Sequence, residues 1–123
     1  DSDEAQRYLE LGADGLVISN HGGRQLDAAP SVVSVLPTIR KAVGSEVPLL
    51  ADGGVRSGQD IARMLALGAD FVLMGRPFMY AVVALDKKGG DHVMDVFKAE
   101  LRAVMGQLGC PTLADLPEFL YPK

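Results

Sequence analysis

The sequence predicts an α/β fold in which parallel strands alternate with helices. Short apolar runs of strand length alternate with helical segments three times along the chain. The four residues Leu11-Gly12-Ala13-Asp14 precede the first run and recur as Leu67-Gly68-Ala69-Asp70 before the third, which indicates repeated units. Because parallel strands joined by helices cross over in one hand, these units are expected to share a sheet.

Composition fits a folded domain and excludes several classes of function. The chain has 123 residues, of which 48% are hydrophobic, and a net charge of −4, values typical of globular chains and not of disordered ones. An acidic balance without a basic run gives no electrostatic case for binding nucleic acid. The single cysteine, Cys110, leaves no internal disulfide and no cysteine cluster for a metal, and no metal site is expected.

The first unit is expected to begin with a helix at residues 1–11, which Ser2 or Asp3 caps and Gly12 ends. Residues 15–19 then form a short strand. This run is too apolar to leave one face in water, so we expect it to be buried on both faces.

The second unit starts with a helix over residues 30–43 that ends at Gly44. Pro37 lies inside this range and is expected to break or kink the helix, because proline lacks the required N–H group. Residues 47–51 form the second strand.

The third unit begins at Ser57, which is expected to cap a helix with Asp60 at capping-box spacing. The third strand is expected at residues 71–74, followed by a helix to about residue 85. Residues 87–90 are expected to be a loop, and a long amphipathic helix should follow from Asp91, its expected cap, to Leu108. The apolar face of that helix comprises Val93, Val96, Phe97, Leu101, Val104 and Met105.

Three units do not close a (β/α)₈ barrel, which needs eight strands and typically ~250 residues. The chain is therefore expected to be the last part of such a barrel, with residues 1–123 as the C-terminal part of a single domain. The competing architecture is a small open α/β sheet.

The polar turn after the first strand holds the strongest candidates for catalysis. His21 can accept a proton near physiological pH, and Arg24 offers a planar guanidinium that matches a carboxylate in two parallel hydrogen bonds. The glycines between them, Gly22-Gly23, do not obstruct a ligand. The pair therefore suits an acidic substrate. The alternative is a surface loop whose histidine and arginine are only solvated.

Every predicted strand is followed by glycine and a basic residue. In parallel α/β folds, ligands collect at the carboxyl ends of the strands, and in barrels the last two strand loops often hold a phosphate. Arg56 and Arg76 would add positive charge to such a site, whereas the carboxylate of Asp52 suits a hydroxyl group. The alternative for each loop is a turn with a solvated arginine. The glycine and arginine residues that follow the three strands are Gly23-Arg24, Gly54-Val55-Arg56 and Gly75-Arg76.

Residues 19–27, 52–56 and 75–78 together resemble the motifs of the FMN-dependent 2-hydroxy acid dehydrogenases and oxidases. This is the family of glycolate oxidase, L-lactate dehydrogenase and mandelate dehydrogenase, and the resemblance covers essentially the whole chain. It implies a (β/α)₈ barrel in which the three strands are the sixth to the eighth. The first four strands of that family and the flavin-contacting lysine of its fifth strand would then lie outside the chain.

The resemblance also implies roles for single residues. His21 would be the active-site base, Arg24 would bind the substrate carboxylate, and Ser19 would contact the flavin. The ribityl phosphate of FMN would be held by Asp52, Gly53, Gly54, Val55, Arg56, Gly75 and Arg76.

The implied reaction is the FMN-dependent oxidation of a small (S)-2-hydroxy acid, such as lactate, to the 2-oxo acid. The electron acceptor stays open between oxygen, a quinone and a cytochrome. Gly22-Gly23, where some oxidases of the family have Gly-Ala, favours an L-lactate dehydrogenase-like enzyme over an oxidase. A homo-oligomer, specifically a tetramer, is expected in the cytoplasm, with the periphery of the inner membrane as the second location.

Two other functions compete. Another phosphate- or FMN-binding barrel enzyme, such as a flavin-dependent isomerase or a nucleotide dehydrogenase, would explain residues 52–54 but not His21 with Arg24. The second alternative is that the chain is a non-catalytic fragment, inactive without the missing strands. Three strands with open edges should also make the isolated chain poorly soluble or prone to associate.

Overall fold

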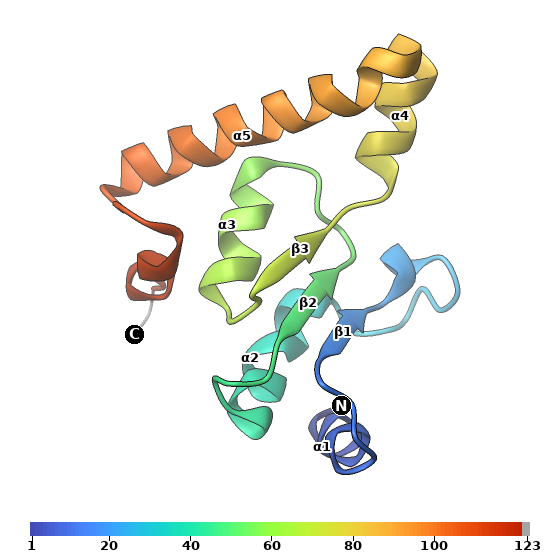
Figure 1. Cartoon of the computed structure of the whole chain (residues 1–123), viewed down its shortest axis with the longest axis vertical. Coiled ribbons are helices and arrows are strands. Elements are labelled where there is room, and N and C mark those ends of the chain that lie inside the picture. Colours follow the sequence, from blue (N-terminus) through green and yellow to red (C-terminus); the bar gives the residue numbers. More distant parts are fainter. Residues whose placement is uncertain (122–123) are drawn as a thin grey trace.

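The computed structural model, which describes residues 1–121, contains one parallel sheet of three strands (Figure 1). The strands are β1 (Leu16–Ser19), β2 (Leu49–Asp52) and β3 (Phe71–Leu73), and they lie in the order β1-β2-β3. All three were predicted from the sequence, with bounds that differ by one or two residues. Because the strands are parallel, their carboxyl ends lie at one edge of the sheet.

One face of the sheet is covered by α1 (Ser2–Glu10), α2 (Val32–Val43) and α3 (Gly58–Ala66) (Figure 1). The central strand supplies the middle of this core, since Leu49 and Ala51 are fully buried. The helices contribute buried side chains from their sheet-facing sides: Ala5, Val32, Leu36, Ile39 and Met64.

The opposite face of the sheet is open. Strand register aligns Val17, Leu50 and Phe71 in one row across this face, and Val17 and Phe71 are 57% and 61% exposed. The prediction that the first strand is buried on both faces is therefore wrong for this chain. Within residues 1–121, no element covers this row, which would face the interior of a closed barrel.

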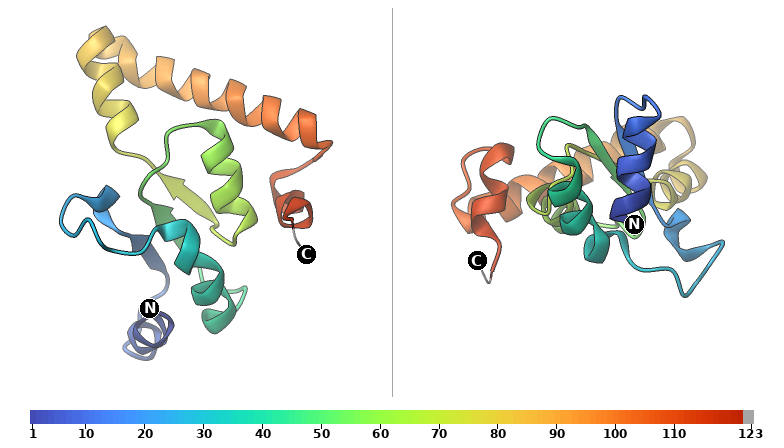
Figure 2. Two further views of the ribbon diagram at one scale, coloured as in Figure 1. Left: turned by 180° about the vertical axis from the view of Figure 1, so that it is seen from behind. Right: turned by 90° about the horizontal axis from the view of Figure 1, so that it is seen from below.

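The carboxyl-terminal third forms a second layer outside α3. It comprises α4 (Arg76–Leu85), the 3₁₀ turn η2 (Asp86–Lys88), α5 (Gly89–Leu108) and the 3₁₀ segment η3 (Leu113–Phe119). The helix α5 runs across α3, and η3 packs beside α3 (Figures 1 and 2). A second core joins α3 to this layer through Ala62, Ala66, Cys110 and Leu116. None of the helices within the described part of the chain has the length and apolarity needed to cross a bilayer.

The long helix begins earlier than its sequence indicates. Residues 87–90 are not a loop, because they belong to η2 and the start of α5, and Asp91 lies in the first turn of α5 and does not cap it. Gly89 explains the difference. It is buried, and a side chain there would collide with the backbone of Ala81 in α4. The glycine therefore serves the close α4–α5 crossing and does not end a helix.

The predicted cap of α1 is also wrong, and the predicted break of α2 at Pro37 does not occur. The cap of α1 is Asp1, and neither Ser2 nor Asp3, because the Asp1 carboxylate accepts a hydrogen bond from the Glu4 N–H group at 2.9 Å. The helix α2 continues through Pro37 without a break. The packing of α2 against the sheet outweighs the one backbone hydrogen bond that the proline removes.

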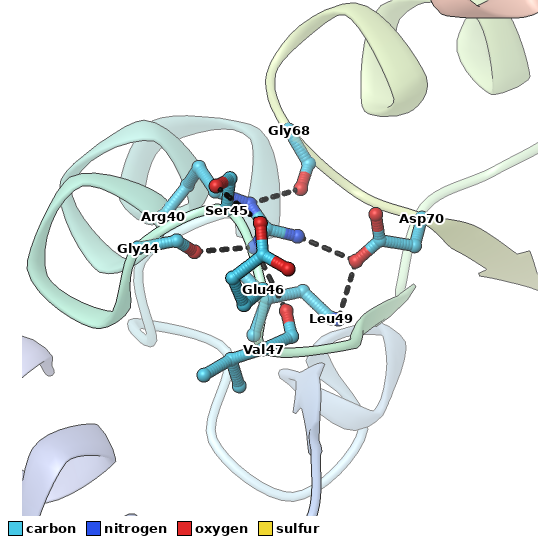
Figure 3. A network of polar contacts seen from close by, with 8 residues as sticks. All are labelled: Arg40, Gly44, Ser45, Glu46, Val47, Leu49, Gly68 and Asp70. Atoms are coloured by element: carbon cyan, nitrogen blue, oxygen red, sulfur yellow. Dashed lines mark hydrogen bonds and ion pairs between the residues drawn. The ribbon is translucent and has the colours of Figure 1, made fainter.

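A network of hydrogen bonds around Arg40 connects the amino ends of β2 and β3 (Figure 3). The Arg40 guanidinium donates to the carbonyl oxygens of Gly44, Val47 and Gly68 at 2.7–2.8 Å and pairs with the Asp70 carboxylate at 2.5 Å. The same Asp70 oxygen accepts from the Leu49 N–H group at 2.7 Å. One side chain thus ties α2 to the starts of β2 and β3.

Candidate active site

The carboxyl ends of the strands form a pocket that gathers nine of the ten site residues predicted from the sequence. The one exception is Ser19, which lies outside this lining. The pocket has a volume of about 200 Å³, which is below the ~300–1,000 Å³ typical of a small-molecule site. The nine residues are His21, Arg24, Asp52, Gly53, Gly54, Val55, Arg56, Gly75 and Arg76.

Ser19 remains close to this group. It is the last residue of β1 and pairs in register with Asp52, the last residue of β2. Both side chains therefore project from the open face of the sheet, one strand apart. The Ser19 hydroxyl also accepts a hydrogen bond from the His21 N–H group at 3.0 Å, which fixes the start of the turn.

The turn at His21–Gly23 (η1) is built on left-handed backbone. His21 has φ = 52°, and Gly22 and Gly23 have φ = 66° and 74°. For a residue with a side chain, this conformation costs roughly 1–2 kcal/mol. Strain of this kind persists only where surrounding contacts hold it, and such positions cluster at functional sites.

The pocket is positively charged although the chain is acidic. Three guanidinium groups, from Arg24, Arg56 and Arg76, line it with a single carboxylate, that of Asp52, while the chain as a whole carries a net charge of −4. Among residues 1–121, no hydrogen bond or ion pair engages the guanidinium group of Arg24 or Arg56. The pocket can therefore attract and bind anions.

The loop from Asp52 to Arg56 exposes backbone to the pocket. Gly53 and Gly54 have φ = 117° and 78°, and a Cβ atom at Gly54 would meet nothing within 4 Å. Val55 is buried and anchors the loop in the core. An approaching anion therefore meets main-chain atoms and the Arg56 side chain.

The amino-termini of α3 and α4 lie beside this loop. They differ in how many of their backbone N–H groups are hydrogen-bonded to side chains. In α3, the Asp60 N–H group bonds to the Ser57 hydroxyl, and the Gly58 N–H group bonds to the Glu100 carboxylate at 2.6 Å. The Asp60 carboxylate also accepts from the Arg56 N–H group. Two carboxylates thus already occupy the positive end of α3, which disfavours a further anion there.

The amino-terminus of α4 is open by comparison. No side chain within the described residues caps it, and its cap residue, Gly75, has open space where a side chain would be. The first residue of the helix, Arg76, reaches back to the Gly22 carbonyl oxygen at 3.3 Å. An uncapped helix amino-terminus with an adjacent arginine fits a phosphate group.

Asn20 was missed in the prediction from sequence. Its side-chain oxygen accepts a hydrogen bond from the Gly22 N–H group at 3.0 Å and caps η1. Two sequence signals could have indicated it: the preference of asparagine for such cap positions and its place within the motif of residues 19–27. Pocket-lining residues outside the predicted motifs were also missed, among them Leu73, Met74 and Met79.

Comparisons with known proteins extend over almost the whole chain. A family model described as FMN-dependent dehydrogenase matches residues 1–122. An L-lactate dehydrogenase of Bartonella tribocorum is 47% identical over 116 residues, which are 94% of this chain and 30% of that protein. An L-lactate dehydrogenase of a Caulobacter species is 46% identical over 123 residues, which are 100% of this chain and 32% of that protein.

Solved structures of lactate and mandelate oxidases also match almost the whole chain. The crystal structure of a protein described as a lactate oxidase of Pediococcus acidilactici superposes with a TM-score of 0.90 at 40% identity, covering 95% of this chain and 33% of that one. A mandelate oxidase superposes with a TM-score of 0.90 at 40% identity, covering 96% and 36%. The predicted fold, three βα units as in the C-terminal portion of a (β/α)₈ barrel, is confirmed. The chain spans about a third of the length of these relatives.

Proposed function

Because the chain belongs to the FMN-dependent dehydrogenase family, we propose that it contributes part of the active site of an enzyme that oxidises a small (S)-2-hydroxy acid to the 2-oxo acid. Residues 1–123 would be the C-terminal part of a single catalytic domain. One observation carries the proposal: the His21 imidazole and the Arg24 guanidinium, which has no hydrogen-bond or ion-pair partner among residues 1–121, line the same pocket as the two glycine-arginine loops. A simple phosphate site would require only those loops.

The chain's residues fit FMN. The phosphate would lie between the Gly53-Gly54 backbone and the uncapped amino-terminus of α4, with charge from Arg56 and Arg76. The Asp52 carboxylate would accept hydrogen bonds from ribityl hydroxyls. Ser19, one strand away from Asp52, would contact the flavin. When bound, FMN supplies a two-electron acceptor.

The substrate would be held and deprotonated by the η1 turn. Arg24 presents a planar fork that can bind the substrate carboxylate with two parallel hydrogen bonds. His21, three residues away, then accepts a proton from the α-carbon or the hydroxyl group while the substrate is oxidised. Fixing the carboxylate also fixes the reacting carbon relative to the imidazole, which supplies the orientation part of the rate enhancement.

We further propose a lactate-like substrate and a dehydrogenase. Two relatives named L-lactate dehydrogenase are 47% identical to this chain, whereas a lactate oxidase and a mandelate oxidase of known structure are 40% identical. The Gly22-Gly23 sequence of the turn also favours a dehydrogenase over an oxidase. The homotetramer, the cellular location and the identity of the electron acceptor stay predictions.

The proposal is tested in a chimaera, in which this chain replaces the matching third of the Bartonella tribocorum L-lactate dehydrogenase. The purified chimaera should show a flavin absorbance band that bleaches on anaerobic addition of L-lactate. Reoxidation by a quinone analogue, compared with oxygen, then separates dehydrogenase from oxidase. A band that none of lactate, glycolate or mandelate bleaches would contradict the proposal and favour another FMN-binding enzyme.

The role of His21 has its own test in the chimaera. His21→Gln should lower kcat/KM by roughly 10²–10⁴-fold while the flavin band is kept, because only proton transfer is removed. The control is His92→Gln, since His92 is exposed on α5 and lies outside the pocket. Near-normal activity of the His21 variant would show that another group is the base.

A further inference from the structure

The backbone at His21 needs external support. Of residues 1–121, only His21 and Asp86 combine a side chain with positive φ, and His21 is followed by two further left-handed residues. Two backbone hydrogen bonds close the turn, from the Gly23 N–H group to the Asn20 carbonyl oxygen and from the Arg24 N–H group to the His21 carbonyl oxygen. Neither of them involves the N–H groups of His21 and Gly22, which bond to side chains. Whatever holds it also determines where the imidazole points.

Two neighbouring side chains supply this support. The Ser19 hydroxyl accepts from the His21 N–H group, and the Asn20 side-chain oxygen accepts from the Gly22 N–H group, both at 3.0 Å. The Asn20 amide nitrogen also donates to the Pro30 carbonyl oxygen at 3.4 Å. Asn20 thereby connects the turn to the segment that enters α2.

Asn20 also contacts the second loop of the pocket. Its side-chain oxygen lies so close to Gly53 that a Cβ atom at residue 53 would collide with it. Gly53 has φ = 117° and begins the glycine pair of the proposed FMN loop. The same oxygen atom therefore faces both the turn that carries His21 and the loop that follows Asp52.

We propose that Asn20 is a positioning residue, which holds His21 in its left-handed conformation and sets the spacing between the His21 turn and the Gly53 loop. Asn20 would not contact the reacting atoms; it would act through these two backbone segments. This inference rests on the proposed function, because the spacing matters only if His21 and FMN work on one substrate. It goes beyond a local cap, since a cap alone would not require the contact with Gly53.

The inference predicts a loss of rate and not a loss of fold. In the chimaera, Asn20→Ala should lower kcat per bound flavin by roughly ten- to a hundredfold, the size expected for a displaced catalytic group. Flavin content should stay near that of the unsubstituted chimaera. Asn20→Asp keeps an oxygen that can accept from Gly22, so it should retain clearly more of the rate than Asn20→Ala. Flavin reduction after rapid anaerobic mixing with L-lactate measures the step directly.

Thr112→Ala serves as the matched control. Thr112 is likewise the cap residue of a 3₁₀ segment, η3, where its hydroxyl donates to the Asp115 carboxylate at 2.7 Å, and it lies outside the pocket lining. It should lower the melting temperature without changing kcat per bound flavin, which is the behaviour of a purely structural cap.

The outcomes separate the two proposals. An active chimaera in which Asn20→Ala keeps kcat per bound flavin within twofold would overturn the positioning role alone. So would an Asn20→Asp variant no faster than Asn20→Ala, because the accepting oxygen would then not matter. An unsubstituted chimaera that binds flavin but oxidises no 2-hydroxy acid would overturn the proposed function, and the positioning role with it.

Discussion

Gly22 and Arg76 join the loops that follow β1 and β3. The Arg76 guanidinium donates a hydrogen bond to the Gly22 carbonyl oxygen at 3.3 Å, and a Cβ atom at residue 22 would lie 2.7 Å from the same guanidinium. The contact spans the pocket from its first loop to its last. It couples the proposed base to an arginine of the proposed phosphate site.

Gly22→Ala should therefore weaken both stability and FMN binding. The left-handed backbone at φ = 66° disfavours alanine by roughly 1–2 kcal/mol, and the new methyl group displaces Arg76. Urea unfolding of the chimaera and FMN titration after removal of the flavin measure the two effects. Gly106→Ala is the control, because Gly106 is in α5 with open space around it and alanine there should stabilise by about 0.5–1 kcal/mol. Unchanged FMN affinity in Gly22→Ala would rule out the coupling.

Arg24→Lys should raise KM for L-lactate by roughly tenfold or more, with a smaller change in kcat. Lysine keeps the charge but loses the planar fork that binds both carboxylate oxygens, so chiefly substrate binding is lost. Steady-state kinetics of the chimaera separate the two parameters. Arg7→Lys on α1, outside the pocket, should leave both unchanged. A KM equal to that of the unsubstituted chimaera would remove Arg24 from the carboxylate site.

Arg40→Met should lower the free energy of unfolding of the chimaera by about 2–4 kcal/mol, because carbonyl oxygens of three residues and one carboxylate lose a charged donor. Its neighbour Lys41 is exposed, and Lys41→Met should change stability by no more than about 0.5 kcal/mol. Denaturant unfolding measures both. Activity per bound flavin should survive in Arg40→Met, since the network lies at the amino ends of the strands. Equal stability of the two variants would show that the network contributes little.

The isolated 123-residue chain should associate in solution, because the row of Val17, Leu50 and Phe71 is open on the sheet face. Light scattering coupled to gel filtration should show a mass well above the 13.0 kDa of one chain. Phe71→Ser should reduce the association. The control is Leu11→Ser, which removes a side chain that is 75% exposed but lies off the sheet. A monomer that unfolds cooperatively would contradict this prediction.

The sequence predicted most of what depends on local pattern. The strands follow from apolar runs between glycine turns, and the gathering of His21, Arg56 and Arg76 follows because parallel strands end at one edge. The capping oxygen of Ser57 was equally visible, since its bond to the Asp60 N–H group needs only neighbouring residues. Whether these residues act as proposed stays a prediction.

Features that depend on contacts between residues far apart in the sequence were not predicted. The exposure of Val17 depends on what lies across the sheet. Gly89 resembles a helix breaker in sequence, and only the crossing of α4 and α5 reveals its use. The contact of Asn20 with Gly53 joins residues 33 positions apart in the sequence, and no local pattern marks it.

The position of the Arg40 network has a consequence for how this fold can change. Arg40 and Asp70 hold β2 and β3 together at their amino ends, whereas the pocket lies at the carboxyl ends of the strands. The contacts that stabilise β2 and β3 thus lie at the opposite end of these strands from the proposed chemistry. Substitutions that alter substrate preference in the pocket loops can accumulate while this network keeps the scaffold intact, so an engineer could reinforce one end before diversifying the other.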